Sequence, residues 1–164
     1  MSATEFRSED GRFGLTVPER ALADLRRFCE AAQAVETGGI LVGFYTPSGD
    51  SAVVTRVTGP PMDSKAGSTW FQRGTDAVNE QLVGFWGKGE FYLGEWHFHP
   101  DGAPPVPSDQ DCKQLQEIAA SKQYHCPEPI LAVASLLTKG DLSLAAFVFP
   151  RRRTRMALSE LPSR

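Results

Sequence analysis

Phe91-Tyr-Leu-Gly-Glu-Trp-His-Phe-His-Pro100 is the stretch from which the rest of this 164-residue sequence can be interpreted. It holds two of the chain's three histidines, His97 and His99. Its apolar residues predict a buried strand over 91–98. Side chains two residues apart on a strand point to the same face, so the two imidazoles would lie together. They could converge on one cation, although a histidine on a strand more often only packs.

Ser108-Asp-Gln-Asp111 follows this strand after a stiff, proline-rich loop over 100–107. A Ser-x-x-Asp ahead of an apolar run is typical of a capping box, and that alone would explain it. It predicts a helix over 108–123 with Asp111 in the first turn, directed back toward the histidines. His97, His99 and Asp111 would then form a His₂Asp set. Three protein ligands with one open position are typical of catalytic rather than structural zinc.

Glu36-Thr-Gly-Gly39 supplies a carboxylate at the start of a predicted buried strand over 38–45. Two adjacent glycines at a strand start indicate a bulge, or the close approach of another backbone or a ligand. Glu36 is therefore a candidate general base for a metal site. The alternative is a solvated connector between a helix and a strand, which is the usual place of a Glu before Gly.

The remaining pattern mixes hairpins with interleaved helices and predicts an α+β domain with a mostly antiparallel, mixed sheet. Residues 1–10 are expected to form a flexible leader, 11–150 the folded domain and 151–164 a basic C-terminal tail. The further expected strands are 12–17, 52–58, 130–137 and 142–149, with a short edge strand at 69–72; the further helices are 18–33 and 74–85.

The composition fits one domain and excludes several classes of protein. The hydrophobic fraction is 41% and the charged fraction 23%, which is ordinary for a chain that folds around a core. A formal net charge of -3 argues against nucleic acid and anionic membrane as partners. The longest apolar run is too short to span a bilayer, and the polar N-terminal residues are not expected to serve as a signal peptide. Three widely spaced cysteines indicate reduced thiols and a cytoplasmic protein.

Several other residues allow two interpretations. Glu95 shares the face of His97, where it could support a ligand or simply be exposed or paired. Cys112 beside Asp111 is expected to pack rather than to act as a nucleophile, and His125 to be solvated. Trp70 and Phe71, in the segment 62–73, could line a groove for an extended peptide added as a strand, or could cover the core.

The three motifs together resemble the JAMM (MPN+) metalloprotease family in its compact prokaryotic JAB form. The family pattern is a Glu ahead of a Gly-rich strand, then His-x-His-Pro, then Ser-x-x-Asp at the start of a helix. Here these are Glu36, His97 to Pro100, and Ser108 to Asp111. The loop between His99 and Ser108 is one residue longer than is usual in the family. The resemblance implies a single MPN/JAB, cytidine-deaminase-like domain: a curved, mostly antiparallel sheet flanked by about three helices.

The resemblance also implies an activity, a cofactor and partners. His97, His99 and Asp111 would hold one Zn²⁺ per chain, Glu36 would act as the general base and Ser108 would stabilise the oxyanion. The reaction would be hydrolysis of the amide bond after the C-terminus of a ubiquitin-like modifier or conjugated protein. Similar proteins look like deconjugating peptidases of CBASS-like anti-phage operons, which suggests E1- and E2-like enzymes as possible partners.

Other functions remain open from the sequence. MPN domains that have lost their ligands serve as non-catalytic assembly subunits. A peptidase that trims the precursor of a ubiquitin-like sulfur carrier would carry the same motifs. A RadC-like role near DNA is disfavoured by the acidic balance of the chain.

Overall fold

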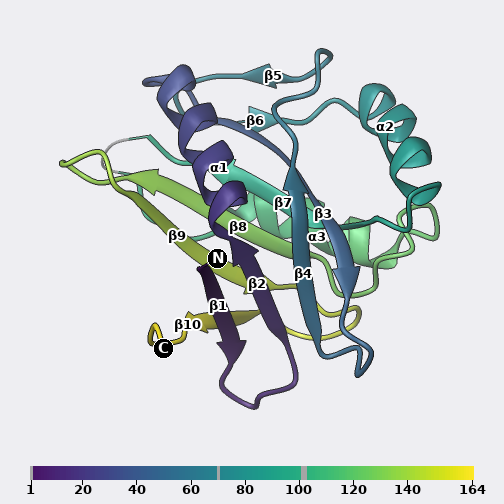
Figure 1. Ribbon diagram of the computed structural model, residues 1–164. Coiled ribbons are helices and arrows are strands. Elements are labelled where there is room, and N and C mark those ends of the chain that lie inside the picture. Colours follow the sequence, from purple (N-terminus) through teal and green to yellow (C-terminus); the bar gives the residue numbers. More distant parts are fainter. Residues whose placement is uncertain (1, 70, 101–102) are drawn as a thin grey trace.

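The fold is an eight-stranded mixed barrel with three helices packed around it (Figure 1). The computed structural model describes residues 2–69, 71–100 and 103–164. The barrel strands are β1 (Ala3–Ser8), β2 (Gly14–Pro18), β3 (Thr37–Tyr45), β4 (Ser51–Val57), β7 (Phe91–Phe98), β8 (Ile130–Leu136), β9 (Leu142–Val148) and β10 (Met156–Glu160). The helices are α1 (Glu19–Ala32), α2 (Asp76–Trp86) and α3 (Asp109–Ala120), and a separate hairpin pairs β5 (Lys65–Ala66) with β6 (Phe71–Gln72).

The strands follow the order β1-β10-β9-β8-β7-β3-β4-β2, and the barrel closes where β1 pairs with β2. Only β2 with β4 and β7 with β8 are parallel; the other barrel pairs are antiparallel. The prediction of an α+β domain with a mixed, mostly antiparallel sheet and three helices is therefore confirmed. Closure of the sheet was not predicted, because it depends on the two terminal strands.

Both faces of the central strands are buried, which explains their continuous apolar runs. Leu41 of β3 faces the interior, where strands from around the barrel and the apolar stripe of α1 form one cluster. Its neighbours Ile40 and Val42 face outward and pack against α2. On β8, Leu131 and Val133 also face outward, against α3. Helices α2 and α3 therefore cover the outer face of the barrel.

The ends of the domain differ from the expected leader and tail. Residues 3–8 form β1, with Phe6 2% exposed, and residues 156–160 form β10, with Leu158 5% exposed. The two strands pair with each other, Phe6 opposite Glu160. Each is short and buries only one or two of its residues, so its pattern is weak until its neighbours define a buried face. The arginines at 151–153 lie in an exposed turn between β9 and β10.

The other predicted elements are found within a few residues of their expected bounds. Helix α1 begins after Pro18 and buries Ala21, Leu25 and Cys29 on one face. Strand β7 has the predicted bounds, and the predicted hairpin of β3 with β4 forms. Within the described residues, no helix combines the length and apolar character needed to cross a membrane.

Candidate active site

The pairing of β3 with β7 brings the candidate base to the histidines. Thr37 pairs with Phe98 and Gly38 with His97. Glu36, the residue before Thr37, therefore stands next to the end of β7, where His99 follows the strand. Glu36 as a whole residue is 9% exposed and is buried, so its interpretation as a solvated connector is wrong.

The two glycines of β3 are required by close neighbours. A Cβ on Gly39 would lie 2.1 Å from the carbonyl oxygen of Thr58, and one on Gly38 would lie 2.5 Å from that of Trp96. The Gly38 Cβ would also meet the rings of His97 and Phe71 at 2.9 Å. Of the alternatives open from the sequence, the approach of another backbone is the one found. Gly38 additionally leaves room for the imidazole of His97.

Asp111 reaches the site from the first turn of α3. Ser108 caps this helix: its Oγ accepts from the Asp111 N–H at 3.1 Å, while its own N–H donates to Asp111 Oδ2 at 2.9 Å. The predicted capping box is therefore present. Because both ends of the box are bonded, the carboxylate of Asp111 is held in one orientation. A cap of this kind stabilises a helix by about 1 kcal/mol.

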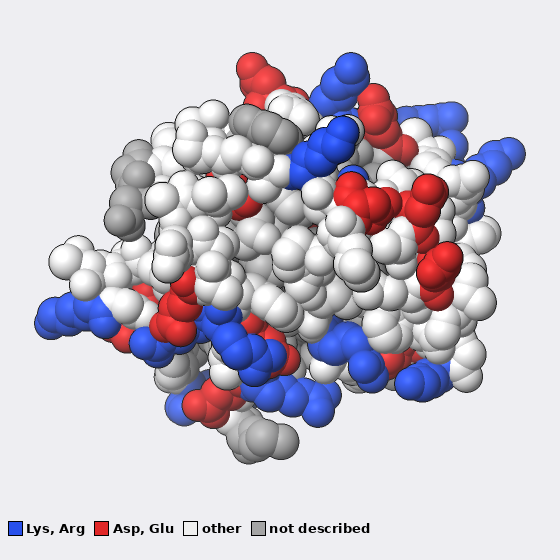
Figure 2. All heavy atoms as spheres, turned by 90° about the horizontal axis from the view of Figure 1, so that it is seen from above, with Lys and Arg blue, Asp and Glu red and all other residues white. Residues whose placement is uncertain are grey.

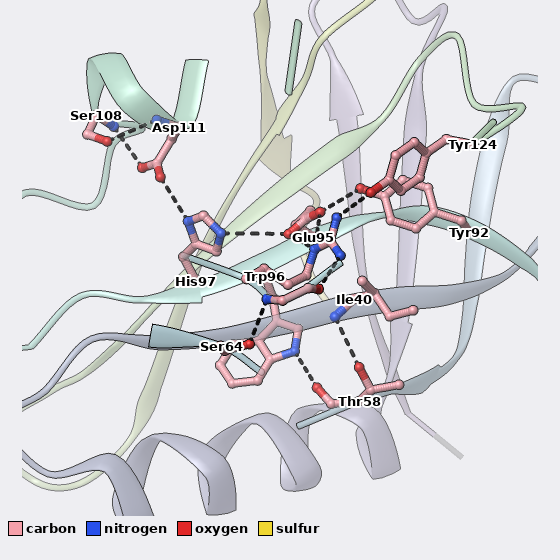
Figure 3. Close-up of polar contacts among 12 residues, drawn as sticks. Ile40, Thr58, Ser64, Tyr92, Glu95, Trp96, His97, Ser108, Asp111 and Tyr124 are labelled. Carbon is pink, nitrogen blue, oxygen red and sulfur yellow. Dashed lines mark hydrogen bonds and ion pairs between the residues drawn. The ribbon is translucent and has the colours of Figure 1, made fainter. Parts of the chain in front are cut away.

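The carboxylate of Asp111 lies near both imidazoles, and Figure 3 shows its contact with His97. Its Oδ1 is 2.9 Å from His97 Nδ1, and its Oδ2 is 3.8 Å from His99 Nε2. All three side chains are nearly buried, at 1%, 7% and 10% exposure for His97, His99 and Asp111. Three residues from a strand end and a helix start, predicted from spacing alone to converge, do come together.

The hydrogen bonding of His99 leaves one ring nitrogen available. Its Nδ1 is 2.8 Å from the carbonyl oxygen of Pro104, which can only accept, so Nδ1 carries a proton. The other ring nitrogen, Nε2, lies on the side of Asp111, 3.8 Å from its Oδ2. A histidine whose second nitrogen is held by a carbonyl is the usual arrangement of a metal ligand.

The carboxylates of Asp111 and Glu95 stabilise a positive charge on His97, which lies between them. Burial alone would lower the pKa of His97, but the hydrogen bond that its imidazolium donates to Asp111, together with the nearby Glu95, raises it to about 9. Burial opposes ionisation of Asp111 too, yet His97 and Ser108 bring its pKa down to about 2. Burial, followed by the charge of Asp111, raises the pKa of Glu36, although both histidines act in the opposite direction. A carboxyl group with a raised pKa is a better proton acceptor at neutral pH than an exposed one.

The donor set suits a divalent metal, although the side chains are not in a preformed coordination geometry. Among the described residues, no group of three His, Cys, Asp or Glu side chains is arranged to hold an ion directly. Instead, His97 is hydrogen-bonded to Asp111, and this contact favours the protonated, positively charged form of the imidazole. A metal ion would supply positive charge at the same place, with two imidazoles and one carboxylate as ligands.

We expect the metal-free protein to lose stability as the pH rises from about 6.5 to about 9. The folded-state pKa of His97 is raised, so its imidazolium stabilises the fold below the unfolded pKa, and this is lost as pH passes through the folded value. The loss should be on the order of 3 kcal/mol. The free energy of unfolding is measured by chemical denaturation at each pH, on protein freed of metal with a chelator. The H97Q variant should lack this slope and H125Q should keep it; an equal slope in H97Q would contradict the assignment.

A buried ion pair lies behind His97 and was not predicted. Arg73 Nε donates to both carboxylate oxygens of Glu95, at 2.7 and 2.9 Å, and Arg73 Nη2 bonds to Tyr124 Oη at 2.6 Å. Glu95 also accepts from Tyr92 Oη at 2.9 Å and lies 3.9 Å from His97 Nε2. Glu95 is therefore both paired and next to a candidate ligand. The alternation of β7 indicated its face, but no local signal pointed to Arg73.

The hairpin β5–β6 borders the site. Phe71 is 5% exposed and its ring centroid is 5.5 Å from that of His97, edge to face. Phe71 also lines a cavity of about 310 Å³ with Glu36 and Val35. Phe71 thus covers the site and borders an opening beside it. Trp70, the other candidate substrate contact, lies outside the described residues.

The remaining candidates lie away from the histidines. Cys29 is in the core, and burial raises the pKa of its thiol to about 12. Cys112 is partly buried against the barrel, where its Sγ lies 2.7 Å from an Arg155 nitrogen. His125 is exposed, as expected.

Comparison with known proteins matches this geometry to a family. The model of prokaryotic homologues of the JAB domain matches residues 18–147. A CD-NTase/cGAS isopeptidase of Enterobacter hormaechei is 36% identical over 95% of this chain and 86% of its own length. A protein of Sinorhizobium fredii named "Probable metalloprotease" is 23% identical over 87% of this chain and 86% of its own. A solution structure from Desulfitobacterium hafniense shares the fold, with a TM-score of 0.58 and 19% identity over 90% of this chain and 88% of that one.

These matches to JAB-domain, isopeptidase and metalloprotease homologues indicate a hydrolase. The chain belongs to the prokaryotic JAB domain family. The resemblance seen in the sequence is therefore confirmed, and the family implies a bound metal.

Proposed function

We propose that this protein is a zinc isopeptidase that releases a CD-NTase/cGAS-like protein from an amide-linked conjugate, as part of an anti-phage defence system. The convergence of His97 and His99 on Asp111, with Glu36 beside them, is the observation that carries this proposal. The substrate is suggested by the isopeptidase relative at 36% identity. The bond would join the C-terminal carboxyl group of the conjugated protein to an amine of its target.

We assign the chemical roles as follows. His97, His99 and Asp111 would hold one zinc ion per chain, which when bound polarises the scissile carbonyl and makes water more acidic. Glu36 accepts the proton of the attacking water and delivers it to the leaving amine, so the amide nitrogen departs neutral. The Ser108 Oγ accepts from Asp111 N–H, which leaves its own O–H free to donate to the oxyanion.

The hairpin β5–β6 is the proposed docking edge for the substrate tail. The cavity of about 310 Å³ lies between Glu36 and the hairpin residues Lys65, Ala66 and Phe71, so a peptide in it would pass the base. Short exposed strands bind extended peptides through main-chain hydrogen bonds. Seen from the side of this hairpin, the middle of the surface is largely uncharged, with both signs of charge around it (Figure 2). Such a surface suits main-chain recognition.

We place the protein in the cytoplasm, together with possible E1- and E2-like enzymes that would make the conjugate. The three cysteines are unpaired, which suits a reducing compartment. The alternative of a non-catalytic scaffold is less favoured, because a scaffold would not need Glu36 buried against the histidines.

The test is cleavage of a defined conjugate. A CD-NTase joined through its C-terminus to a lysine side chain should be cleaved by the zinc-loaded protein, and a chelator should stop the reaction. A linear precursor with a ubiquitin-like tail serves as the comparison substrate. Preference for the linear precursor would favour the sulfur-carrier alternative, and no cleavage of either would favour the scaffold.

A further inference from the structure

The Arg73–Glu95 ion pair is not used by the chemistry proposed above, yet both of its side chains are almost completely buried. The side chains of Arg73 and Glu95 are 3% and 0% exposed. Removing two charges from water is so unfavourable that replacing such a pair by uncharged residues often leaves a protein equally stable. Stability alone is therefore a weak reason for its presence, and its position suggests another.

On one side, the pair contacts a candidate metal ligand. Glu95 Oε2 lies 3.9 Å from His97 Nε2, and this nitrogen is buried without a hydrogen-bond partner among the described residues. Glu95 and Asp111 thus face the imidazole of His97 from opposite edges (Figure 3). A carboxylate beside the second nitrogen of a ligating histidine commonly fixes the orientation of the ring.

On the other side, the pair holds the hairpin. Arg73 directly follows β6, and its guanidinium also donates to the Gly74 carbonyl at 2.9 Å. The same hairpin is attached to the candidate base, because the Glu36 N–H donates to the Gly67 carbonyl at 2.9 Å. The hairpin therefore connects Glu36 at its turn with His97 at its end, and Phe71 packs between them on the His97 ring.

We infer that Arg73 is a positioning residue: through Glu95 it locks the β5–β6 hairpin and the His97 ring into one arrangement. The planar guanidinium of Arg73 donates in three directions at once: Nε to Glu95, Nη1 to the Gly74 carbonyl and Nη2 to Tyr124 Oη. A lysine ammonium lacks this fixed planar set of donors. The lock keeps the proposed substrate edge in register with Glu36 and the ligands. The expected effect of the Arg73–Glu95 pair on catalysis rests on the proposed function. Its role in attaching the hairpin does not depend on that function.

The test uses R73M/E95Q, which removes both charges and so leaves no lone charge buried. Circular dichroism and thermal unfolding should show a folded protein. Hydrogen exchange of the amides at 65–72 should be faster than in wild type, with and without zinc. In conjugate cleavage, kcat/KM should fall about 10–100-fold, with KM raised as well as kcat lowered. R73K, which keeps the charge but not the planar set of donors, should be intermediate in both measurements.

The matched control is R56M/E90Q. Arg56 and Glu90 also form an ion pair, with Arg56 Nε 3.1 Å from Glu90 Oε2, but at the opposite end of β7 from His97. This variant should keep wild-type kinetics and wild-type exchange at 65–72.

Two results would overturn the inference. One is R73M/E95Q with unchanged exchange at the hairpin; the other is faster exchange with unchanged kcat and KM, which would reduce the pair to a structural one. If wild type itself does not cleave the conjugate, the proposed function fails, and hairpin exchange still decides whether Arg73 holds the hairpin.

Discussion

The E36Q variant should bind zinc like wild type and cleave the conjugate about 10²–10⁴-fold more slowly. Glutamine keeps the size of Glu36 and its place beside the histidines but cannot accept the proton of water. The backbone N–H of residue 36 still donates to Gly67, so the hairpin should keep its position. Zinc content by atomic absorption and kcat at saturating conjugate measure the two effects separately.

The matched control is E30Q, at an exposed position on α1, which should have wild-type kcat. E36Q cleaving at the wild-type rate would show that another group moves the proton. E36Q that loses zinc would instead place Glu36 among the ligands.

The D111N variant should purify without zinc and cleave no faster than the chelated wild type. Asparagine keeps the size of Asp111 and an oxygen that can accept from Ser108, so the helix cap should survive. It removes the negative charge that lies near His97 and His99 and that attracts a cation. Metal content, cleavage rate and thermal unfolding are all measured on one preparation.

Asp109 provides the control for this change. It lies two residues earlier in the same first turn and is exposed, so D109N should keep its zinc and its activity. A D111N protein that retained zinc and activity would remove Asp111 from the ligand set.

The local parts of the site could be predicted from the sequence. Alternation on β7 placed His97 and His99 together, and the capping box placed Asp111 in the first turn of α3. Both are set by residues close in the chain, so spacing is sufficient. The two glycines of β3 similarly indicated a close approach, which the carbonyls of Thr58 and Trp96 explain.

The parts that depend on distant pairing could not be predicted. Strands β1 and β10 pair across the whole length of the chain, and each is too short, with too few buried residues, to be recognised alone. Arg73 reaches Glu95 only because the hairpin folds back over β7. An arginine after a short strand has the same local pattern whether it is solvated or buried in an ion pair.

The most direct test follows hydrolysis of the amide bond itself. The zinc-loaded protein is incubated with the CD-NTase–lysine conjugate in water enriched in the heavy oxygen isotope. The masses of the intact products are then measured by mass spectrometry. We expect two products: a target with its free lysine amine, and a CD-NTase whose new C-terminal carboxylate carries heavy oxygen from the solvent. A conjugate that stays whole, or a cut at another peptide bond, would contradict the assignment of this chain as an isopeptidase for that linkage.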